Sequence, residues 1–150
     1  MKITKISNKS IKRVVEILKK GGVVVCPTDT VYGFLADAKN KKAVQKIFKI
    51  KKRPKSKFLP IFVKDLKMAK EIAEIDEQQS KILKKFWPGK YTFVLKTKNN
   101  LVSNSIELDT KGKSKGKSKS IENKNTAIYG VNKETIAIRI PNILNIFLIF

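Results

Sequence analysis

The chain has 150 residues, 41% of them hydrophobic, which suits one globular domain with its own core. Thirty-four Lys and Arg residues against twelve Asp and Glu residues give a formal charge of +22 that would attract nucleotides, RNA or another polyanion, although a composition rich in solvated Lys explains the charge equally well. Histidine is absent and Cys26 is the single cysteine, which excludes Ser-His-Asp and Cys-His catalysis, His-ligated metals, Cys-based zinc sites and intramolecular disulfides.

The first predicted elements are a helix and a short strand. Ser10 can cap a helix whose apolar residues fall on one face, and the glycine pair at 21–22 ends it. The apolar run from Val23 to Cys26 is typical of a strand covered on both faces. A loop is expected from there to Phe34.

A second helix and a second strand follow this loop. Asn40 can cap a helix with an apolar stripe. This helix must end near Lys52, because Pro54 disfavours helical geometry at the residue before it. The run from Leu59 to Val63 predicts another buried strand.

The remaining regular elements alternate in the same way. Asp65 and Asp76 begin two helices, and Trp87-Pro88-Gly89, with Trp87 expected in the core, is a sharp stop before a strand from Tyr91 to Leu95. The alternating segment from Thr135 to Ile140 predicts a further strand. Interleaved helices and strands indicate a single α/β domain over residues 1–150, with helices packed on a twisted sheet.

A segment around residues 99–126 differs in composition from the rest. Its part from Thr110 to Ser120, TKGKSKGKSKS, repels itself and has nothing to bury, so it predicts a disordered insertion. Its GKS triplets do not form a P-loop, because Glu107 or Lys111 stands where the first glycine is required. An auxiliary arm that contacts RNA is the alternative.

Basic side chains gather around Pro54. In an extended segment Lys51 and Arg53 lie on the same side, and Lys57 follows four residues after Arg53. Cations fixed beside strand ends suit a triphosphate, since Arg offers a planar fork and Lys a point charge. A solvated basic face is the alternative interpretation.

The loop CPTDTVYGF, Cys26 to Phe34, follows a buried strand and holds two threonines and an aspartate. Hydroxyl side chains at a strand end can bind a small polar ligand in the crevice of an α/β sheet. An Asp/Thr turn that satisfies its own backbone explains the same residues. Both interpretations stay open on the residues alone.

Four segments in chain order resemble one family. CPTDTVYGF, the helix leading into IKKRP, FWPGKYTFVL and TIAIRIP together resemble the YrdC-like family of L-threonylcarbamoyladenylate synthases. The resemblance covers most of residues 10–98 and then 134–141. It implies a YrdC-like twisted mixed sheet flanked by helices.

The resemblance also implies a reaction and its residues. The family joins L-threonine, bicarbonate or CO2, and ATP into threonylcarbamoyl-AMP and releases pyrophosphate, a nucleotidyltransferase reaction that serves threonylcarbamoyladenosine modification of tRNA. Lys51 and Arg53 would be the catalytic pair. The implied contacts run to ATP from Lys51, Arg53, Lys57 and Thr135, and to threonine from Thr30 and Arg139. Asp29 is expected to orient the loop.

The absence of histidine fits this chemistry. A carbamate is already an anion, so its attack on the α-phosphate requires alignment and charge neutralisation more than a protein base. We expect Mg²⁺ to be held through the phosphates, with no metal site in the protein. The implied partners are a downstream threonylcarbamoyl transferase complex and tRNA or double-stranded RNA. No membrane partner is expected, because no signal peptide or bilayer-spanning run is present, and we expect a cytoplasmic protein.

Two departures from the family bear on activity. Nothing matches the Ser-x-Asn motif that the family carries after the arginine strand, so we expect a sheet that is incomplete at its C-terminus. Phe62 stands where some members place a polar contact to threonine. The alternatives to an active synthase are therefore an inactive truncated member or a non-catalytic YrdC-like protein that binds double-stranded RNA.

Overall fold

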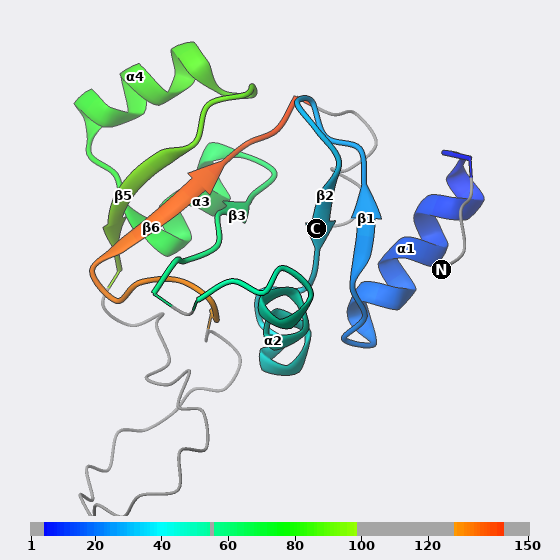
Figure 1. The fold of residues 1–150 in the computed structure, drawn as a ribbon. Coiled ribbons are helices and arrows are strands. Elements are labelled where there is room, and N and C mark those ends of the chain that lie inside the picture. Colours follow the sequence, from blue (N-terminus) through cyan, green and yellow to red (C-terminus); the bar gives the residue numbers. More distant parts are fainter. Residues whose placement is uncertain (1–4, 55, 99–127, 143–150) are drawn as a thin grey trace, which may run out of the picture.

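The computed structural model describes residues 5–54, 56–98 and 128–142 of the chain. Helices and strands alternate in this part as the α/β prediction requires (Figure 1). The elements are α1 (Asn8–Lys19), β1 (Val24–Cys26), β2 (Gly33–Leu35), α2 (Lys41–Ile50), β3 (Ile61–Phe62), α3 (Leu66–Ile72), β4 (Ala73–Glu74), α4 (Glu77–Phe86), β5 (Phe93–Thr97) and β6 (Thr135–Arg139). The predicted insertion at 99–126 lies outside the described residues.

The strands form two sheets. β1 and β2 make an antiparallel hairpin, in which Val25 lies opposite Phe34. The other sheet has the order β3-β6-β5-β4, with β3 parallel to β6 and the other two pairs antiparallel. Figure 1 places α1 and α2 beside the hairpin and α3 and α4 beside the four-stranded sheet. The mixed sheet flanked by helices is therefore confirmed.

The main core lies on one face of the four-stranded sheet. Ile136 and Ile138 of β6 are 1% and 0% exposed and belong to one apolar cluster with Leu83 of α4. Burial of such side chains is the dominant favourable term in folding. Trp87 joins this cluster, as predicted, and its Nε1 donates a hydrogen bond to the carbonyl of Tyr91 at 3.0 Å. The turn after α4 is thus anchored to the core.

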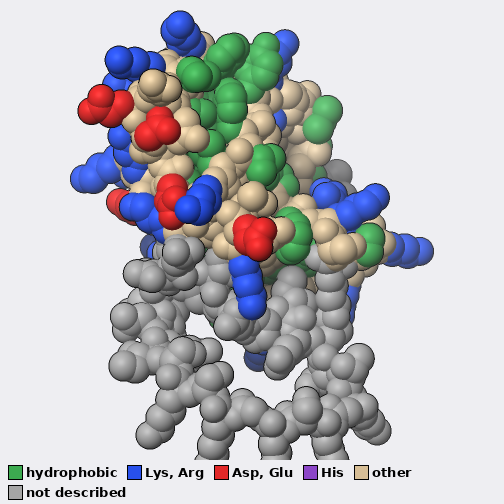
Figure 2. Space-filling model, turned by 90° about the vertical axis from the view of Figure 1, so that its left-hand side faces the viewer, with side chains coloured by type: hydrophobic (Ala, Val, Ile, Leu, Met, Phe, Trp, Pro, Cys, Tyr) green, Lys and Arg blue, Asp and Glu red, His purple; other side chains and the backbone are tan. Residues whose placement is uncertain are grey.

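Apolar side chains also remain on the surface of this half. Figure 2 shows them grouped in the upper part of one face, with Lys and Arg side chains around the margins. The exposed large residues of α4 and β5 are Ile82, Phe86 and Val94. No helix in the described ranges is long and apolar enough to cross a membrane.

The start of α1 differs from the prediction. Ser7, not Ser10, is the N-cap, and its side chain accepts a hydrogen bond from the N–H of Ser10 at 3.2 Å. Ser10 returns a bond, because its hydroxyl accepts from the N–H of Ser7 at 2.8 Å. Two serines three residues apart form a reciprocal capping box, so the helix begins one turn earlier than the single-cap pattern indicates.

The first strand is also less covered than its apolar run predicts. Val25 is 48% exposed, so β1 alternates and is not buried on both faces. Its partner β2 was predicted as part of a loop, because it has three residues and follows a Thr- and Gly-containing turn.

Candidate functional site

A hydrogen-bonded turn after β1 carries the hydroxyl residues predicted to meet a ligand. The hydroxyl of Thr28 accepts from the N–H groups of Thr30 at 3.2 Å and Val31 at 3.1 Å, and donates to the carbonyl of Val31 at 2.6 Å. A hydroxyl has one donor and two acceptor positions, so these bonds within the turn occupy all three positions of the Thr28 hydroxyl. Thr30 lies exposed on the same turn. Its hydroxyl lies 3.1 Å from that of Thr28, so Thr30 belongs to the turn and is also the threonine available to a ligand.

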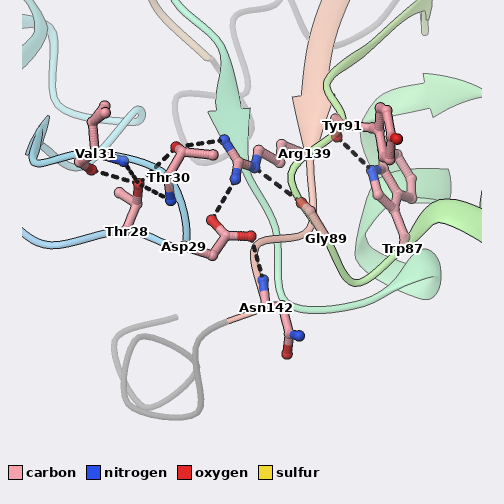
Figure 3. Close-up of polar contacts among 9 residues, drawn as sticks. All are labelled: Thr28, Asp29, Thr30, Val31, Trp87, Gly89, Tyr91, Arg139 and Asn142. Atoms are coloured by element: carbon pink, nitrogen blue, oxygen red, sulfur yellow. Dashed lines mark hydrogen bonds and ion pairs between the residues drawn. The ribbon is translucent and has the colours of Figure 1, made fainter.

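Arg139, the last residue of β6, joins three segments of the chain (Figure 3). Its Nε donates to the carbonyl of Gly89 at 3.0 Å, and its Nη1 donates to the hydroxyl of Thr30 at 3.3 Å. Its Nη2 donates to the carboxylate of Asp29. The structure thus brings the predicted threonine-binding residues Thr30 and Arg139 into direct contact across 109 positions of sequence.

Asp29 and Arg139 form a largely buried ion pair, with 12% and 9% of their side chains exposed. The second oxygen of Asp29, Oδ2, accepts a hydrogen bond from the N–H of Asn142 at 3.0 Å. Burial raises the pKa of Asp29, but the hydrogen bonds from Arg139 and Asn142 and the guanidinium charge outweigh burial. The net pKa therefore lies below its ordinary value, and Asp29 is a carboxylate at neutral pH.

The basic segment after α2 has a different backbone from the one predicted. Lys51 is the helical C-cap residue and Lys52 has a positive φ of 47°, so the segment is not extended. The N–H of Lys52 donates to the carbonyl of Lys49 at 3.2 Å, and that of Arg53 donates to Phe48 at 3.1 Å. These bonds form a Schellman motif. Pro54 follows the motif directly, and a proline is common there because it cannot continue the helix. The predicted alignment of Lys51 and Arg53 by strand alternation is wrong.

Arg53 is instead oriented by the turn that follows it. Its Nε donates to the carbonyl of Lys57 at 2.8 Å, and its Nη2 donates to the carbonyl of Phe58 at 3.1 Å. These two hydrogen bonds fix the plane of the guanidinium, and neither of them involves Nη1. Lys57 presents an exposed side chain from the same turn.

A cavity of about 180 Å³ lies between the hairpin, α2 and β3. Its lining is mainly apolar, with Phe34, Ile47 and Phe62 among the residues, and Lys51 is its charged member. Phe62 also lies beneath Arg139, whose Cζ is 5.8 Å from the ring centroid. The cavity is therefore lined by Lys51 and by Phe62, and Phe62 is the lining residue that contacts Arg139.

Thr135 is separated from this group. It is the first residue of β6, exposed, and lies opposite Lys96 of β5, whereas Arg139 is the last residue of the same strand. Four residues of strand correspond to about 13 Å. A ligand that meets both residues must extend along β6.

Sequence reasoning missed two backbone contributors to the site. The carbonyl of Gly89 holds Arg139, and the N–H of Asn142 holds Asp29. Backbone groups carry no side-chain signal, so only the three-dimensional path of the chain reveals them. Asp29 was expected to orient its own loop. Its carboxylate instead bonds to Arg139, which lies 110 positions away in the sequence. In the described ranges, no three His, Cys, Asp or Glu side chains cluster to hold a metal ion.

Comparison with known proteins identifies the family. The Sua5/YciO/YrdC family model, described as telomere recombination, matches residues 16–144. The chain belongs to this family. The resemblance read from the four sequence motifs is therefore confirmed.

Two relatives of the chain are named as threonylcarbamoyl-AMP synthases. A Methanocaldococcus jannaschii protein provisionally named threonylcarbamoyl-AMP synthase is 41% identical over 102 residues, 65% of this chain and 49% of that protein. A Bacillus subtilis threonylcarbamoyl-AMP synthase is 35% identical over 94 residues, 62% of this chain and 27% of that protein. The chain thus spans about half the length, or less, of these relatives.

Solved structures of the family agree with the fold. Sua5 of P. abyssi, crystallised with L-threonine, superposes with a TM-score of 0.69 at 27% identity and covers 97% of this chain and 36% of its own. E. coli YciO superposes with the same TM-score, 0.69, at 24% identity, over 97% of this chain and 59% of its own, which supports the fold alone. The mixed α/β architecture of the Sua5/YciO/YrdC family is therefore present here.

Proposed function

We propose that this chain carries the substrate site of an L-threonylcarbamoyladenylate synthase. The reaction would join L-threonine, bicarbonate or CO2, and ATP into threonylcarbamoyl-AMP and pyrophosphate, for threonylcarbamoyladenosine modification of tRNA. Relatives named threonylcarbamoyl-AMP synthase support this proposal. Because the chain spans only part of those relatives, the activity is proposed for the site and its residues.

One observation carries the proposal most directly. Thr30 and Arg139, from opposite ends of the family match, meet at 3.3 Å beside an apolar cavity. A hydroxyl and a guanidinium together suit the carboxylate of an amino acid, because both can donate hydrogen bonds to its oxygens. The threonine-bound Sua5 neighbour has this same fold. We therefore assign Thr30 and Arg139 to threonine.

The phosphates of ATP are assigned to the basic segment after α2. Lys51 lines the cavity, Arg53 has a guanidinium oriented by two backbone carbonyls, and Lys57 lies exposed on the same turn. Pre-oriented cations stabilise developing phosphate charge without reorganising during the reaction. We assign Lys51 and Arg53 the catalytic role and Lys57 a binding role. Thr135 is proposed to contact ATP where the nucleotide extends along β6.

The chemistry requires these residues to align and neutralise charge. The carbamate oxygen formed from threonine and CO2 attacks the α-phosphorus, the bond from that phosphorus to the bridging oxygen breaks, and pyrophosphate leaves. Both oxygens of Asp29 are bonded to Arg139 and Asn142, so this carboxylate does not suit a metal. We propose that Mg²⁺ comes with the phosphates, where it would offset their charge.

A second candidate function rests on the charge of the chain. The formal +22 would hold an RNA partner, whether tRNA or double-stranded RNA, through its phosphates. Non-catalytic binding of this kind should weaken steeply as salt rises. Replacing Arg53 alone should leave it nearly unchanged, since one of 34 basic residues is lost.

Pyrophosphate release tests the leading proposal. The protein is incubated with ATP, bicarbonate and L-threonine, and release is compared with and without the amino acid. Threonine-dependent release is expected, and it should disappear in Arg139→Ala. A folded sample that releases pyrophosphate equally without threonine, or releases none, overturns the proposed activity of this chain. A downstream threonylcarbamoyl transferase complex is the proposed recipient of the product.

A further inference from the structure

Two segments that are distant in sequence from Arg139 converge on its guanidinium (Figure 3). The turn after β1 supplies Asp29 and Thr30, and the turn after α4 supplies the carbonyl of Gly89. Arg139 is only 7% exposed. A long side chain with this many fixed contacts has little remaining rotamer freedom. Its orientation is therefore set before any ligand arrives.

The contacts account for part of the hydrogen-bonding capacity of Arg139. A guanidinium has five N–H donors. In the described part of the structure Nε uses its donor on Gly89, while Nη1 and Nη2 each use one, on Thr30 and Asp29. One N–H on each terminal nitrogen is left for another acceptor. A carboxylate is the acceptor whose two oxygens match two guanidinium donors.

Both carboxylate oxygens of Asp29 accept hydrogen bonds. Its Oδ1 receives Arg139 and its Oδ2 receives the N–H of Asn142 at 3.0 Å. Both donors come from the end of β6 and the residues just after it, so Asp29 ties that strand end to the turn containing Thr30. In the described part of the structure each oxygen of Asp29 already accepts one hydrogen bond, from Arg139 and from Asn142. Its main effect on a ligand is therefore expected through Arg139, which it holds, and through the turn that carries Thr30.

We propose that Asp29 is a positioning residue for carboxylate recognition: it holds Arg139 so that the two remaining N–H groups and the hydroxyl of Thr30 meet the carboxylate of an amino-acid substrate. This inference rests on the proposed function and deepens it. The ion pair is neutral overall, so recognition comes from hydrogen-bond geometry more than from net charge. In the opposite role, Asp29 would shield Arg139, and removing Asp29 would strengthen carboxylate binding.

Ligands with and without a carboxylate separate these roles. Binding of L-threonine and of L-threoninamide, whose neutral amide replaces the carboxylate, is measured by calorimetry on the full chain. The ratio of the two affinities reports carboxylate recognition and is insensitive to a uniform loss of folded protein. The variants are Asp29→Ala and Asp29→Asn, the latter keeping the size of the side chain. Asp76→Ala is the matched control, because it removes an aspartate that caps α4.

The expected result is a preference for threonine over threoninamide of about tenfold or more in the unmodified protein and in Asp76→Ala. Asp29→Ala should abolish most of this preference, and Asp29→Asn should reduce it by a smaller factor. ATP affinity should change little in either variant. An unchanged or larger preference in Asp29→Asn overturns the positioning role alone. Failure of the unmodified protein to bind threonine overturns the proposed function, and this inference with it.

Discussion

The guanidinium of Arg53 donates from Nε to the carbonyl of Lys57 at 2.8 Å, so this cation is held by the turn that it precedes. A second bond, from Nη2 to the carbonyl of Phe58 at 3.1 Å, completes the arrangement. The side chain thus has two roles: it closes the turn after α2, and it presents its remaining edge to solvent. Substitutions at Arg53 should affect both.

Arg53→Lys should lower both stability and ATP affinity, although the charge is kept. A lysine ammonium cannot replace the planar two-point contact with the carbonyls of Lys57 and Phe58. We expect a loss of about 1–2 kcal/mol in the free energy of unfolding and weaker ATP binding. Urea unfolding and calorimetric titration with ATP measure the two effects. Arg13→Lys, at an exposed position of α1, is the control; equal behaviour of both variants would contradict the turn-closing role.

Lys52→Gly should stabilise the protein. Lys52 has a φ of 47° at the position after the helix C-cap, where glycine is favoured because it has no Cβ. We expect a gain of about 0.5–1 kcal/mol, the usual effect of removing a side chain from a left-handed backbone after allowing for glycine's unfolded-state entropy. Chemical denaturation measures it.

Lys49→Gly is the control for Lys52→Gly, because it should lower stability where Lys52→Gly raises it. Lys49 lies within the last turn of α2, where glycine costs about 1 kcal/mol. Stabilisation at Lys52 together with destabilisation at Lys49 is the expected pattern. Loss of stability in both variants would mean that the Schellman geometry is not retained in solution.

The Asp29–Arg139 pair should make stability fall in acid. The pKa of Asp29 is lower in the folded protein than its ordinary value, so the unfolded chain takes up this proton first as pH falls. The contribution of the pair is complete above the unfolded pKa, near 4, and is lost as pH falls through the lower folded pKa. Unfolding free energies measured from about pH 6 to about pH 3 should converge between the native protein and Asp29→Asn. A constant difference between the two proteins over this range would be inconsistent with the pair.

Cys26 should react slowly with thiol reagents in the folded protein. It ends β1, is 9% exposed, and burial raises the pKa of its thiol. Because the thiolate is the reactive form, both burial and the raised pKa suppress reaction at neutral pH. An aromatic disulfide reagent should label the single cysteine much faster in urea than in buffer. Equal rates in the two solutions would indicate that β1 is open in the native state.

Most helices and strands could be predicted from short sequence patterns. The elements that were missed are short strands. Asn40, Asp65 and Asp76 cap helices as predicted, because each can accept a bond from a backbone N–H three residues on. The two-residue strand β4 was not predicted, since Ala73 and Glu74 carry too little sequence for a period of two to appear. Strand β2 was missed for the same reason.

The site was predictable to the extent that side chains identify it. Thr30 and Arg139 were paired through a family resemblance, and the structure brings them into contact. The geometry at Lys51 and Arg53 was not predictable, because a lysine at positive φ gives no signal comparable to a glycine there. Their roles toward ATP, like that of Thr135, remain predictions.

The order of partners around Arg139 has a consequence for the chain during synthesis. Asp29, Thr30 and Gly89 all precede Arg139, and β3 likewise waits for β6, its parallel neighbour. A nascent chain can form α1, α2 and the β1–β2 hairpin from local contacts, which form fastest. The carboxylate of Asp29 has neither of its two partners until residues 139 and 142 have been made. The site therefore appears only after the ribosome has added the arginine strand, whereas its first turn is among the earliest segments made.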